Sequence, residues 1–484
     1  MYLGLDLGTS ALKALLVDDA QRPVGAASAP LAVSRPRPGW AEQDPADWIA
    51  AAESALDALR RAHPAALAAV RGIGLSGQMH GAVALDAGDA VLRPAILWND
   101  TRAAAEAAAL DADPVFRQLT GTIVFPGFTA PKLVWLARHE PDVFARIAGV
   151  LLPKDVLRLW LTGERVSEMS DASGTGWLDV GARGWSEALL DRSGMRVGQM
   201  PRLVEGTAVS GRLRGALAAR WGMVGGVAVA GGAGDNAAAG CGVGAVAPGA
   251  AFVSLGTSGV LFAAADGFRP NAGSAVHTFC HALPGAWHQM GVILSASDAL
   301  DWLAGIVGRD AAALSDALGD TLAAPAGTTF LPYLGGERTP HNDAAIRGAF
   351  VGLAHQSDAA ALTRAVLEGV GFAFRDSLEA LAAAGTPVTR LTAVGGGARS
   401  DYWLKVLATA LGVPVERPAD GDFGAAFGAA RLGMIAAEGA DPAAVCTAPP
   451  VAATFAPETR LQPAFDDAYR RYRALYPALK GATS

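Results

Sequence analysis

Short apolar runs and longer amphipathic stretches alternate along the whole chain. In the first half, runs of strand length and apolar character lie at 2–6, 12–18, 70–75, 82–86 and 227–230. Two alanine-rich stretches, 45–63 and 101–110, have the spacing of amphipathic helices. This alternation predicts an α/β fold.

The second half repeats the same alternation. It predicts a long helix at 359–384 and a strand at 391–394 that ends in a glycine triplet. It also predicts a further helix from about Ser400 and a closing helix near 463–476. A chain of 484 residues exceeds the size of a single core, so we expect at least two domains. Residues 242–249 are rich in glycine and contain a proline, so this segment is the best candidate for a hinge between the domains.

One short motif occurs in both halves. Leu7-Gly8-Thr9-Ser10 follows Asp6, and Leu255-Gly256-Thr257-Ser258 follows Ser254; each motif joins two apolar runs, which predicts a β-hairpin. Glycine lets the backbone approach a ligand, and the hydroxyls and turn amides can donate to phosphate oxygens. The pair therefore predicts two related domains that hold a nucleotide's phosphates, and only the first hairpin offers a carboxylate to a metal.

Composition narrows the class of protein. With 51% hydrophobic and 18% charged residues the chain can bury large cores, and its net charge of −7 argues against nucleic acid and anionic membranes as partners. No apolar stretch approaches the ~20 residues of a membrane span, and the chain opens directly into a strand without a signal-like segment. Three scattered cysteines imply no disulfide framework, so we expect a cytoplasmic protein.

Two carboxylates are the main candidates for chemistry. Asp6 would be a Mg²⁺ ligand with Lys13 neutralising phosphate charge; the alternative is an ordinary hairpin whose turn Asp6 caps. Asp235 lies in the small-residue loop 231–236, where it could accept a proton from a substrate hydroxyl during phosphoryl transfer. The alternative is that Asp235 or Asn236 merely caps the following helix.

Other segments offer binding groups. Met79 and His80 follow a buried strand, and the Trp98 ring can lie on a sugar's apolar face, although a structural histidine or core tryptophan is at least as common. The glycine turn at 395–397 would let a nucleotide approach the backbone. A zinc site from His277, Cys280, His281 and His288 is not predicted, because strand alternation sends His277 and Cys280 to opposite faces.

Together these residues resemble the FGGY family of carbohydrate kinases over nearly the whole chain. Residues 127–139 are similar to the family's first signature, and 348–368 to its second, with Ala361 where a polar residue is usual. The resemblance implies two actin-like, hexokinase-like ATPase domains with a ribonuclease H-like core and a cleft between them. The domains would be 1–245 (sugar and first phosphate hairpin) and 250–440 (nucleotide), followed by a C-terminal extension, 441–484.

Within the family, Met79-His80 replaces the Arg-Glu of glycerol kinases, and the chain looks most similar to members that phosphorylate D-xylulose. The resemblance implies ATP-dependent formation of D-xylulose 5-phosphate, with Mg²⁺ and with Asp235 as the base. The implied sugar contacts are Met79, His80, Asp235 and Asn236, to which Trp98 is added from its position in the sequence. The implied Mg-ATP contacts are Asp6, Gly8, Thr9, Ser10, Lys13, Gly256, Thr257, Gly396 and Gly397, and Ser400 falls where several relatives carry Asn near the adenosine.

Two alternatives remain open from the sequence. A kinase of another ketose or polyol (ribulose, glycerol or gluconate) would share every nucleotide feature. A non-catalytic sugar sensor or an actin-like assembly protein is a different class, against which the joint presence of Asp6, Lys13 and Asp235 argues. The expected partners are a sugar and ATP, with no nucleic acid or membrane, and a homodimer is the candidate assembly.

Overall fold

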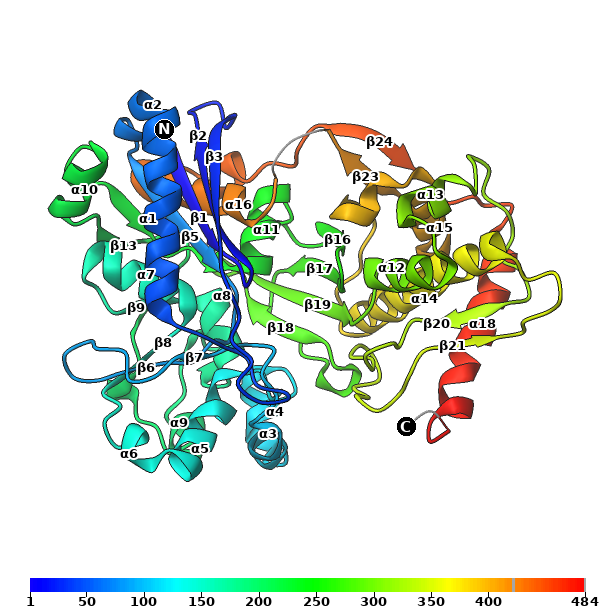
Figure 1. Ribbon diagram of the computed structural model, residues 1–484, viewed down its shortest axis with the longest axis horizontal. Helices are drawn as coiled ribbons and strands as arrows, with labels where there is room; N and C mark the ends of the chain where they lie inside the picture. The colour runs from blue at the N-terminus through cyan, green and yellow to red at the C-terminus, as the bar shows by residue number, and fades with distance from the viewer. Residues whose placement is uncertain (420–422, 483–484) are drawn as a thin grey trace.

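Two lobes, each built on a seven-stranded sheet, lie side by side (Figure 1). The computed structural model describes residues 1–419 and 423–482. The first sheet has the order β13-β14-β5-β1-β2-β3, with β15 paired to β5. Its strands are β1 (Tyr2–Leu7), β2 (Ala11–Val17), β3 (Pro23–Pro30), β5 (Gly72–Gly77), β13 (Val209–Arg212), β14 (Ala228–Ala230) and β15 (Ala233–Gly234).

The second sheet has the order β18-β19-β17-β16-β22-β23-β24. Its strands are β16 (Ala251–Leu255), β17 (Gly259–Ala265), β18 (His277–Cys280), β19 (Trp287–Ile293), β22 (Leu391–Val394), β23 (Val415–Pro418) and β24 (Val451–Phe455). Both sheets share one topology. In each, an antiparallel hairpin (β1–β2 or β16–β17) is followed by two parallel strands, β5 and β14 or β22 and β23. The two predicted hairpins are therefore confirmed and occupy equivalent central positions.

Helix α1 (Pro45–Ala62) shows how the sequence encodes these elements. Asp44 caps its start by accepting a hydrogen bond from the Ala46 amide at 2.9 Å, and Pro45 occupies the first turn, where no amide hydrogen is needed. The helix buries one face, formed by Trp48, Ala52, Leu56 and Leu59, against β2 and β3. It ends before Pro64, so the predicted helix at 45–63 is confirmed.

The predicted second-half elements are confirmed as α14 (Ala359–Ala383), β22, α15 (Asp401–Leu411) and the closing helix α18 (Gln462–Leu479). Two first-half predictions need correction. The run at 82–86 forms β6 (Val83–Leu85), but it pairs with β8 (Gly149–Leu151) outside the main sheet. The helix expected from 101 begins only at Ala104 as α3 (Ala104–Asp111), because the Asp100 carboxylate accepts from the Arg102 amide and side chain and holds that turn.

The remaining helices and strands surround this frame. They are β4 (Glu42–Gln43), α2 (Pro64–Ala68), β7 (Ala95–Ile96), α4 (Pro114–Thr120), α5 (Thr129–His139), α6 (Pro141–Phe144), α7 (Pro153–Thr162), β9 (Val166–Glu168), α8 (Met169–Ala172), β10 (Leu178–Asp179), β11 (Gly184–Trp185), α9 (Glu187–Arg192), β12 (Arg202–Val204), α10 (Gly215–Trp221), α12 (Ser297–Val307), α13 (Ala311–Asp316), β20 (Thr329–Leu331), β21 (Ala349–Val351) and α17 (Pro442–Val445), with short 3₁₀ turns at Ser173–Thr175, Val197–Gln199, Ala272–Ser274 and Gly396–Arg399. Across the described ranges, no helix is both long and apolar enough to cross a membrane.

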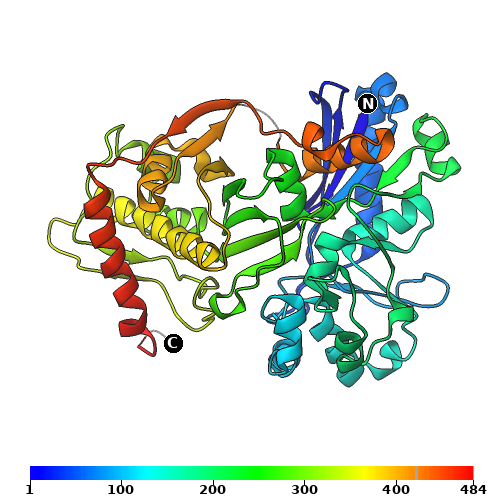
Figure 2. The same cartoon turned by 180° about the vertical axis from the view of Figure 1, so that it is seen from behind.

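One helix from the second half of the chain packs on the first lobe. Helix α16 (Ala425–Glu438) belongs by sequence to the second half, yet it packs on β1 and β5 of the first sheet and against α11 (Asp235–Val243) (Figure 2). Glycines permit this contact, since a Cβ at Gly4 would lie 1.9 Å from the Ala426 carbonyl oxygen and one at Gly74 would lie 1.7 Å from that of Ala429. The chain thus returns to the first lobe before the C-terminal extension.

Candidate active site

The carboxyl ends of three neighbouring strands meet at one edge of the first sheet. Parallel pairing aligns Asp6 of β1 with Ser76 of β5, and Ser76 with Ala233 of β15. The segments that follow these strands are the turn at 8–10, residues 78–80 and Asp235. This is the edge at which α/β proteins bind ligands, and the structure therefore brings the predicted phosphate hairpin, Met79-His80 and Asp235 to the same place.

Asp235 is the first residue of α11 and follows a loop that only glycine can form. A Cβ at Gly232, where φ is +76°, would lie 2.2 Å from the Leu75 carbonyl oxygen, and one at Gly231 would lie 2.2 Å from that of Glu205. The residue at the N-cap of α11 is Gly234, which has no side chain, so the helix-capping alternative does not describe Asp235. Its Oδ1 instead accepts from the amide and side-chain nitrogens of Asn236, at 2.7 and 2.9 Å.

The surroundings of Asp235 make it a stronger base than an ordinary carboxylate. Burial, reinforced by the negative charge of Asp6, raises the pKa of Asp235 to about 6, while the hydrogen bonds from Asn236 lower it. The group is therefore still largely ionised at pH 7, and it holds a proton more readily than a solvated aspartate. This is the balance that general-base catalysis near neutral pH requires.

The turn of the first hairpin is held by side chains around it. The Thr9 hydroxyl donates to Gln78 Oε1 at 3.1 Å and accepts from Trp98 Nε1 at 2.9 Å. Gln43 donates to the Thr9 carbonyl oxygen at 2.8 Å and accepts from Gln78 Nε2 at 3.0 Å. The register of β1 and β2 places Lys13 opposite Asp6. Sequence reasoning missed Gln43 as a site residue, and Gln43 carries no local signal that could have found it.

His80 is held as a neutral ring with a defined tautomer. Its Nδ1 lies 2.7 Å from the Gly174 carbonyl oxygen, which can only accept, so Nδ1 carries the hydrogen and Nε2 is left as an acceptor. Burial lowers the pKa of His80 to about 3, and the ring stacks on Phe128 at 4.6 Å. A neutral imidazole with a free acceptor suits a sugar hydroxyl, which can donate to it.

A cavity of about 180 Å³ opens beside His80. Its lining residues are His80, Trp98, Asn99, Asp100, Thr101, Phe125, Pro126, Gly127, Phe128 and Arg338. Of the predicted sugar contacts, His80 and Trp98 thus line it, whereas Met79, Asp235 and Asn236 do not. Met79 is buried and lies against the Asp235 loop, where a Cβ on Gly234 would come within 2.8 Å of its sulfur.

Arg338 is a cavity residue that sequence reasoning missed. It comes from the second lobe, its guanidinium lies 4.6 Å from the Phe125 ring centroid, and its Nη1 lies 3.4 Å from His277 Nε2. The signal was the turn-rich run Gly336-Glu337-Arg338-Thr339-Pro340, which has neither strand nor helix periodicity. The sugar-side cavity is therefore lined from both lobes.

A larger cavity of about 700 Å³ lies in the second lobe. The predicted nucleotide residues Gly396, Gly397 and Ser400 line it, together with residues of α12 and α13. Gly395 has a φ of +92°, and its turn packs closely against the end of β16. A Cβ on Gly395 would lie 2.8 Å from the Leu255 carbonyl group. Gly256 and Thr257 do not line the cavity; their carbonyl oxygens accept from the Ser297 and Ala296 amides and fix the second hairpin beside it.

Asp6 is the residue that could hold a divalent cation. Within residues 1–419 and 423–482, no group of three or more His, Cys, Asp or Glu side chains is arranged to hold a metal. Mg²⁺ needs fewer protein ligands, because it typically takes one or two carboxylates and completes its shell with phosphate oxygens and water. Asp6, which is close enough to Asp235 to raise its pKa, fits that requirement.

Comparisons with known proteins agree with this geometry. Residues 1–242 match the N-terminal domain of the FGGY family of carbohydrate kinases, and residues 251–437 match its C-terminal domain. The chain is 50% identical over 439 residues to the xylulose kinase of Escherichia coli K12, covering 90% of both chains.

Two solved structures have the same architecture along their whole length. A crystal structure described as a xyloylose kinase, from Brucella ovis, superposes with a TM-score of 0.98 at 66% identity over 99% of both chains. The xylulose kinase of Rhodospirillum rubrum superposes with a TM-score of 0.92 at 31% identity, covering 100% of this chain and 99% of the other. The predicted fold class, two related α/β domains of the sugar kinase and actin-like ATPase type, is confirmed, and the chain belongs to the FGGY family of carbohydrate kinases.

Proposed function

We propose that this carbohydrate kinase transfers the γ-phosphoryl group of ATP to the terminal hydroxyl of D-xylulose, which gives D-xylulose 5-phosphate. The observation that carries the proposal is Asp235, a carboxylate whose pKa is raised to about 6 at the strand edge that also presents Asp6 and the phosphate hairpin. The choice of sugar is supported by the 50% identical xylulose kinase of E. coli and by Met79-His80. Kinases of ribulose, glycerol or gluconate are the less favoured alternatives.

The sugar would bind on the first lobe. His80 Nε2 would accept from one hydroxyl, the Trp98 ring would cover an apolar face, and Asn236 and Met79 would border the end that reacts. Asp235 would take the proton of the terminal hydroxyl as that oxygen attacks the γ-phosphorus in line. This proton transfer is the step for which the raised pKa of Asp235 is suited.

The phosphates would lie between the two hairpins. Amides and hydroxyls of Gly8, Thr9, Ser10, Gly256 and Thr257, with the Lys13 ammonium, would stabilise charge on the transferring oxygens. Asp6 would hold Mg²⁺, which when bound neutralises phosphate charge. The adenosine would occupy the cavity of about 700 Å³ beside Gly396, Gly397 and Ser400.

Three further expectations complete the proposal. The ranges 1–245, 250–440 and 441–484 would be the two domains and the extension, with α16 of the second range packed on the first lobe and β24 of the extension in the second sheet. Closure about residues 242–249 would exclude water from the reaction. We also expect the enzyme to be cytoplasmic and to form a homodimer. Sedimentation analysis tests the assembly, and cell fractionation tests the location.

The direct test is ADP release from the purified protein with a panel of sugars. We expect kcat/KM to be highest for D-xylulose, lower for D-ribulose, in which one hydroxyl is moved, and lowest for glycerol and gluconate, which differ in chain length and, for gluconate, in charge. Equal values for all four sugars would contradict the choice of substrate. No sugar-dependent ADP release would contradict the proposed activity as a whole.

A further inference from the structure

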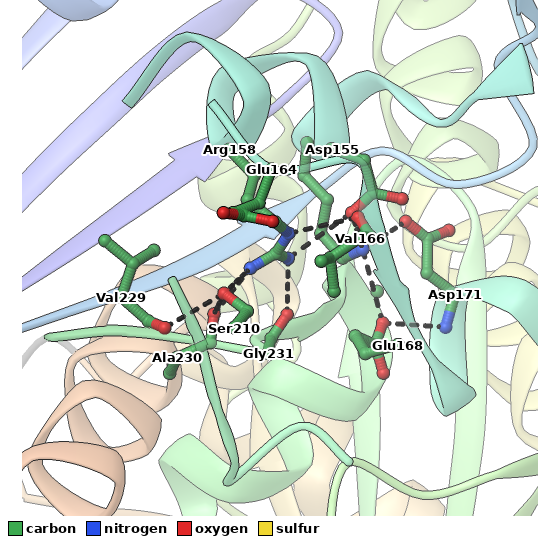
Figure 3. Close-up of polar contacts among 12 residues, drawn as sticks. Asp155, Arg158, Glu164, Val166, Glu168, Asp171, Ser210, Val229, Ala230 and Gly231 are labelled. Carbon is green, nitrogen blue, oxygen red and sulfur yellow. Dashed lines mark hydrogen bonds and ion pairs between the residues drawn. The ribbon is translucent and has the colours of Figure 1, made fainter. Parts of the chain in front are cut away.

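Five charged side chains are buried together beneath the loop that precedes Asp235. They are Lys154, Asp155 and Arg158 of α7, Glu168 at the end of β9, and Asp171 of α8, and all are 0% exposed. Figure 3 shows Asp155, Glu168 and Asp171 to one side of Arg158 and Val229, Ala230 and Gly231 to the other. None of these residues belongs to the sugar or nucleotide site described above.

Arg158 anchors the first part of the loop. Its Nη1 donates to the Ala230 carbonyl oxygen and its Nη2 to that of Gly231, at 2.6 and 2.5 Å (Figure 3). Nη1 also donates to the Ser210 hydroxyl at 2.6 Å, and Nη2 lies 3.3 Å from Asp155. The planar guanidinium thus fixes two consecutive carbonyl groups at once, which a lysine ammonium would not do in the same geometry.

A second chain of contacts anchors the other end of the loop. The Ser170 hydroxyl accepts from the Gly234 amide at 3.1 Å and donates to Glu168 Oε2 at 2.8 Å. The same Glu168 carboxylate caps α8 by accepting from the Ser170 and Asp171 amides. Lys154 Nζ lies 3.4 Å from Glu168 Oε1, 3.0 Å from Asp171 and 2.8 Å from Asp155. Gly234, the residue immediately before Asp235, is therefore tied to a buried ion cluster through one hydroxyl.

Such a cluster is costly unless its charges balance. Burial raises the pKa of Asp171, and the nearby carboxylates of Asp155 and Glu168 raise it further, while the Lys154 ammonium lowers it. Apolar side chains of similar volume often serve stability as well as a buried ion cluster does, so stability alone does not account for these residues.

The loop they hold has little rigidity of its own. Residues 231, 232 and 234 are glycine, which loses more backbone freedom on ordering than any other residue. Side chains anchor Ala230 O, Gly231 O and Gly234 N at its two ends, in addition to the main-chain bonds that the Gly231 and Gly232 amides make and the pairing of β15 with β5. The anchors therefore restrict the position from which Asp235 enters α11, and a displacement of about 1 Å at a reacting group can lower a rate by about 10².

We infer that Ser170 is a positioning residue for phosphoryl transfer, which acts by fixing the Gly234 amide and hence the Asp235 carboxylate against the sugar. Glu168 and Lys154 hold the Ser170 hydroxyl in turn. The inference rests on the proposed role of Asp235 as the base. It concerns the geometry of that base and not the binding of ATP.

The first experiment compares Ser170→Ala with Ser170→Thr, which keeps the hydroxyl, and with Ser193→Ala. Ser193 is a matched control, because it is buried and its hydroxyl accepts from Trp177 Nε1 at 2.7 Å, with no contact to the loop. We expect Ser170→Ala to lower kcat about 10-fold with the KM for ATP changed less than about twofold. Ser170→Thr should recover most of that loss, and Ser193→Ala should keep kcat within about twofold while lowering the melting temperature. A Ser170→Ala enzyme with kcat within about twofold of wild type would overturn the inference.

A double-mutant cycle separates positioning from general damage. If Ser170 acts through Asp235, then Ser170→Ala should change kcat by less than about twofold in an Asp235→Asn background. The same 10-fold loss in that background would overturn the inference, because the serine would then act without the base. The proposed function fails differently: the wild-type enzyme would release no ADP with D-xylulose. In that case the cycle is run with whichever sugar of the panel is turned over.

Discussion

Replacing Asp235 by Asn should slow the enzyme and stabilise the fold at the same time. Asparagine keeps the shape of the side chain but cannot take a proton, so we expect kcat to fall by about 10² or more, the usual scale for general-base catalysis. That loss corresponds to about 3 kcal/mol of transition-state stabilisation. The KM for the sugar should change little, because the contacts of His80 and Trp98 remain.

The stability change follows from the pKa of Asp235. Folding raises that pKa from 3.8 to about 6, so the protonated form is favoured in the native state. The contribution of protonated Asp235 to the free energy of unfolding is therefore fully present below pH 4, and it is lost as the pH rises through 6. At about 1.4 kcal/mol per pKa unit, the ionised carboxylate costs at most about 3 kcal/mol at pH 7, and less because Asp235 is only partly buried by surface area. Asparagine carries no charge and removes this cost, so the melting temperature of the Asp235→Asn enzyme at pH 7 should be higher than that of the wild type.

Two assays measure these effects, namely ADP release under saturating ATP and D-xylulose and thermal unfolding at pH 5 and pH 7. Asp358→Asn is a matched control, since Asp358 caps α14, lines neither of the two cavities, and asparagine caps equally well. It should leave kcat unchanged. An Asp235→Asn enzyme that keeps more than half of wild-type kcat would refute the role of Asp235 as base, and a lower melting temperature at pH 7 would refute the electrostatic argument.

Three other predictions concern the remaining parts of the site. Sugar kcat/KM should fall as the pH drops below about 6, about tenfold per unit, because Asp235 must be ionised to accept a proton; a profile flat from pH 7 to pH 5 would contradict this. His80→Ala should lower kcat/KM for D-xylulose about 10- to 10²-fold, the cost of a sugar hydroxyl left without its acceptor, while ATP saturation is unchanged; an effect confined to ATP would show that His80 is misassigned. Thr257→Val should raise the KM for ATP more than the KM for the sugar, and the reverse order would place the second hairpin elsewhere.

Local sequence patterns predicted most of the helices and strands of the two lobes, because interactions between residues close in the sequence determine these elements. The two Gly-Thr-Ser hairpins lie between apolar runs, and α1 carries its cap, its first-turn proline and its buried face within twenty residues. These features need no knowledge of distant contacts. The common topology of the two sheets then follows from the repeated order of hairpin and parallel strands.

The parts that sequence reasoning missed depend on contacts between distant segments. Nothing local shows that α16 packs on β1, since the signal is the absence of a side chain at Gly4, more than 400 positions away. Gln43 reaches the Thr9 carbonyl oxygen from β4, and Arg338 lines the sugar-side cavity from the second lobe. Asp235 could be singled out from its glycine loop, but its raised pKa depends on its burial and, second, on the charge of Asp6 across the sheet edge.

The position of the phosphate in the product tests the central claim most directly. The wild-type enzyme would be incubated with ATP, Mg²⁺ and ¹³C-labelled D-xylulose, and the product examined by ¹³C and ³¹P NMR. Transfer to the hydroxyl that Asp235 deprotonates predicts phosphorus coupling at the C5 carbon, with one ADP formed for each phosphorylated sugar. Coupling at C1, or ADP formation with unmodified xylulose, would contradict the account.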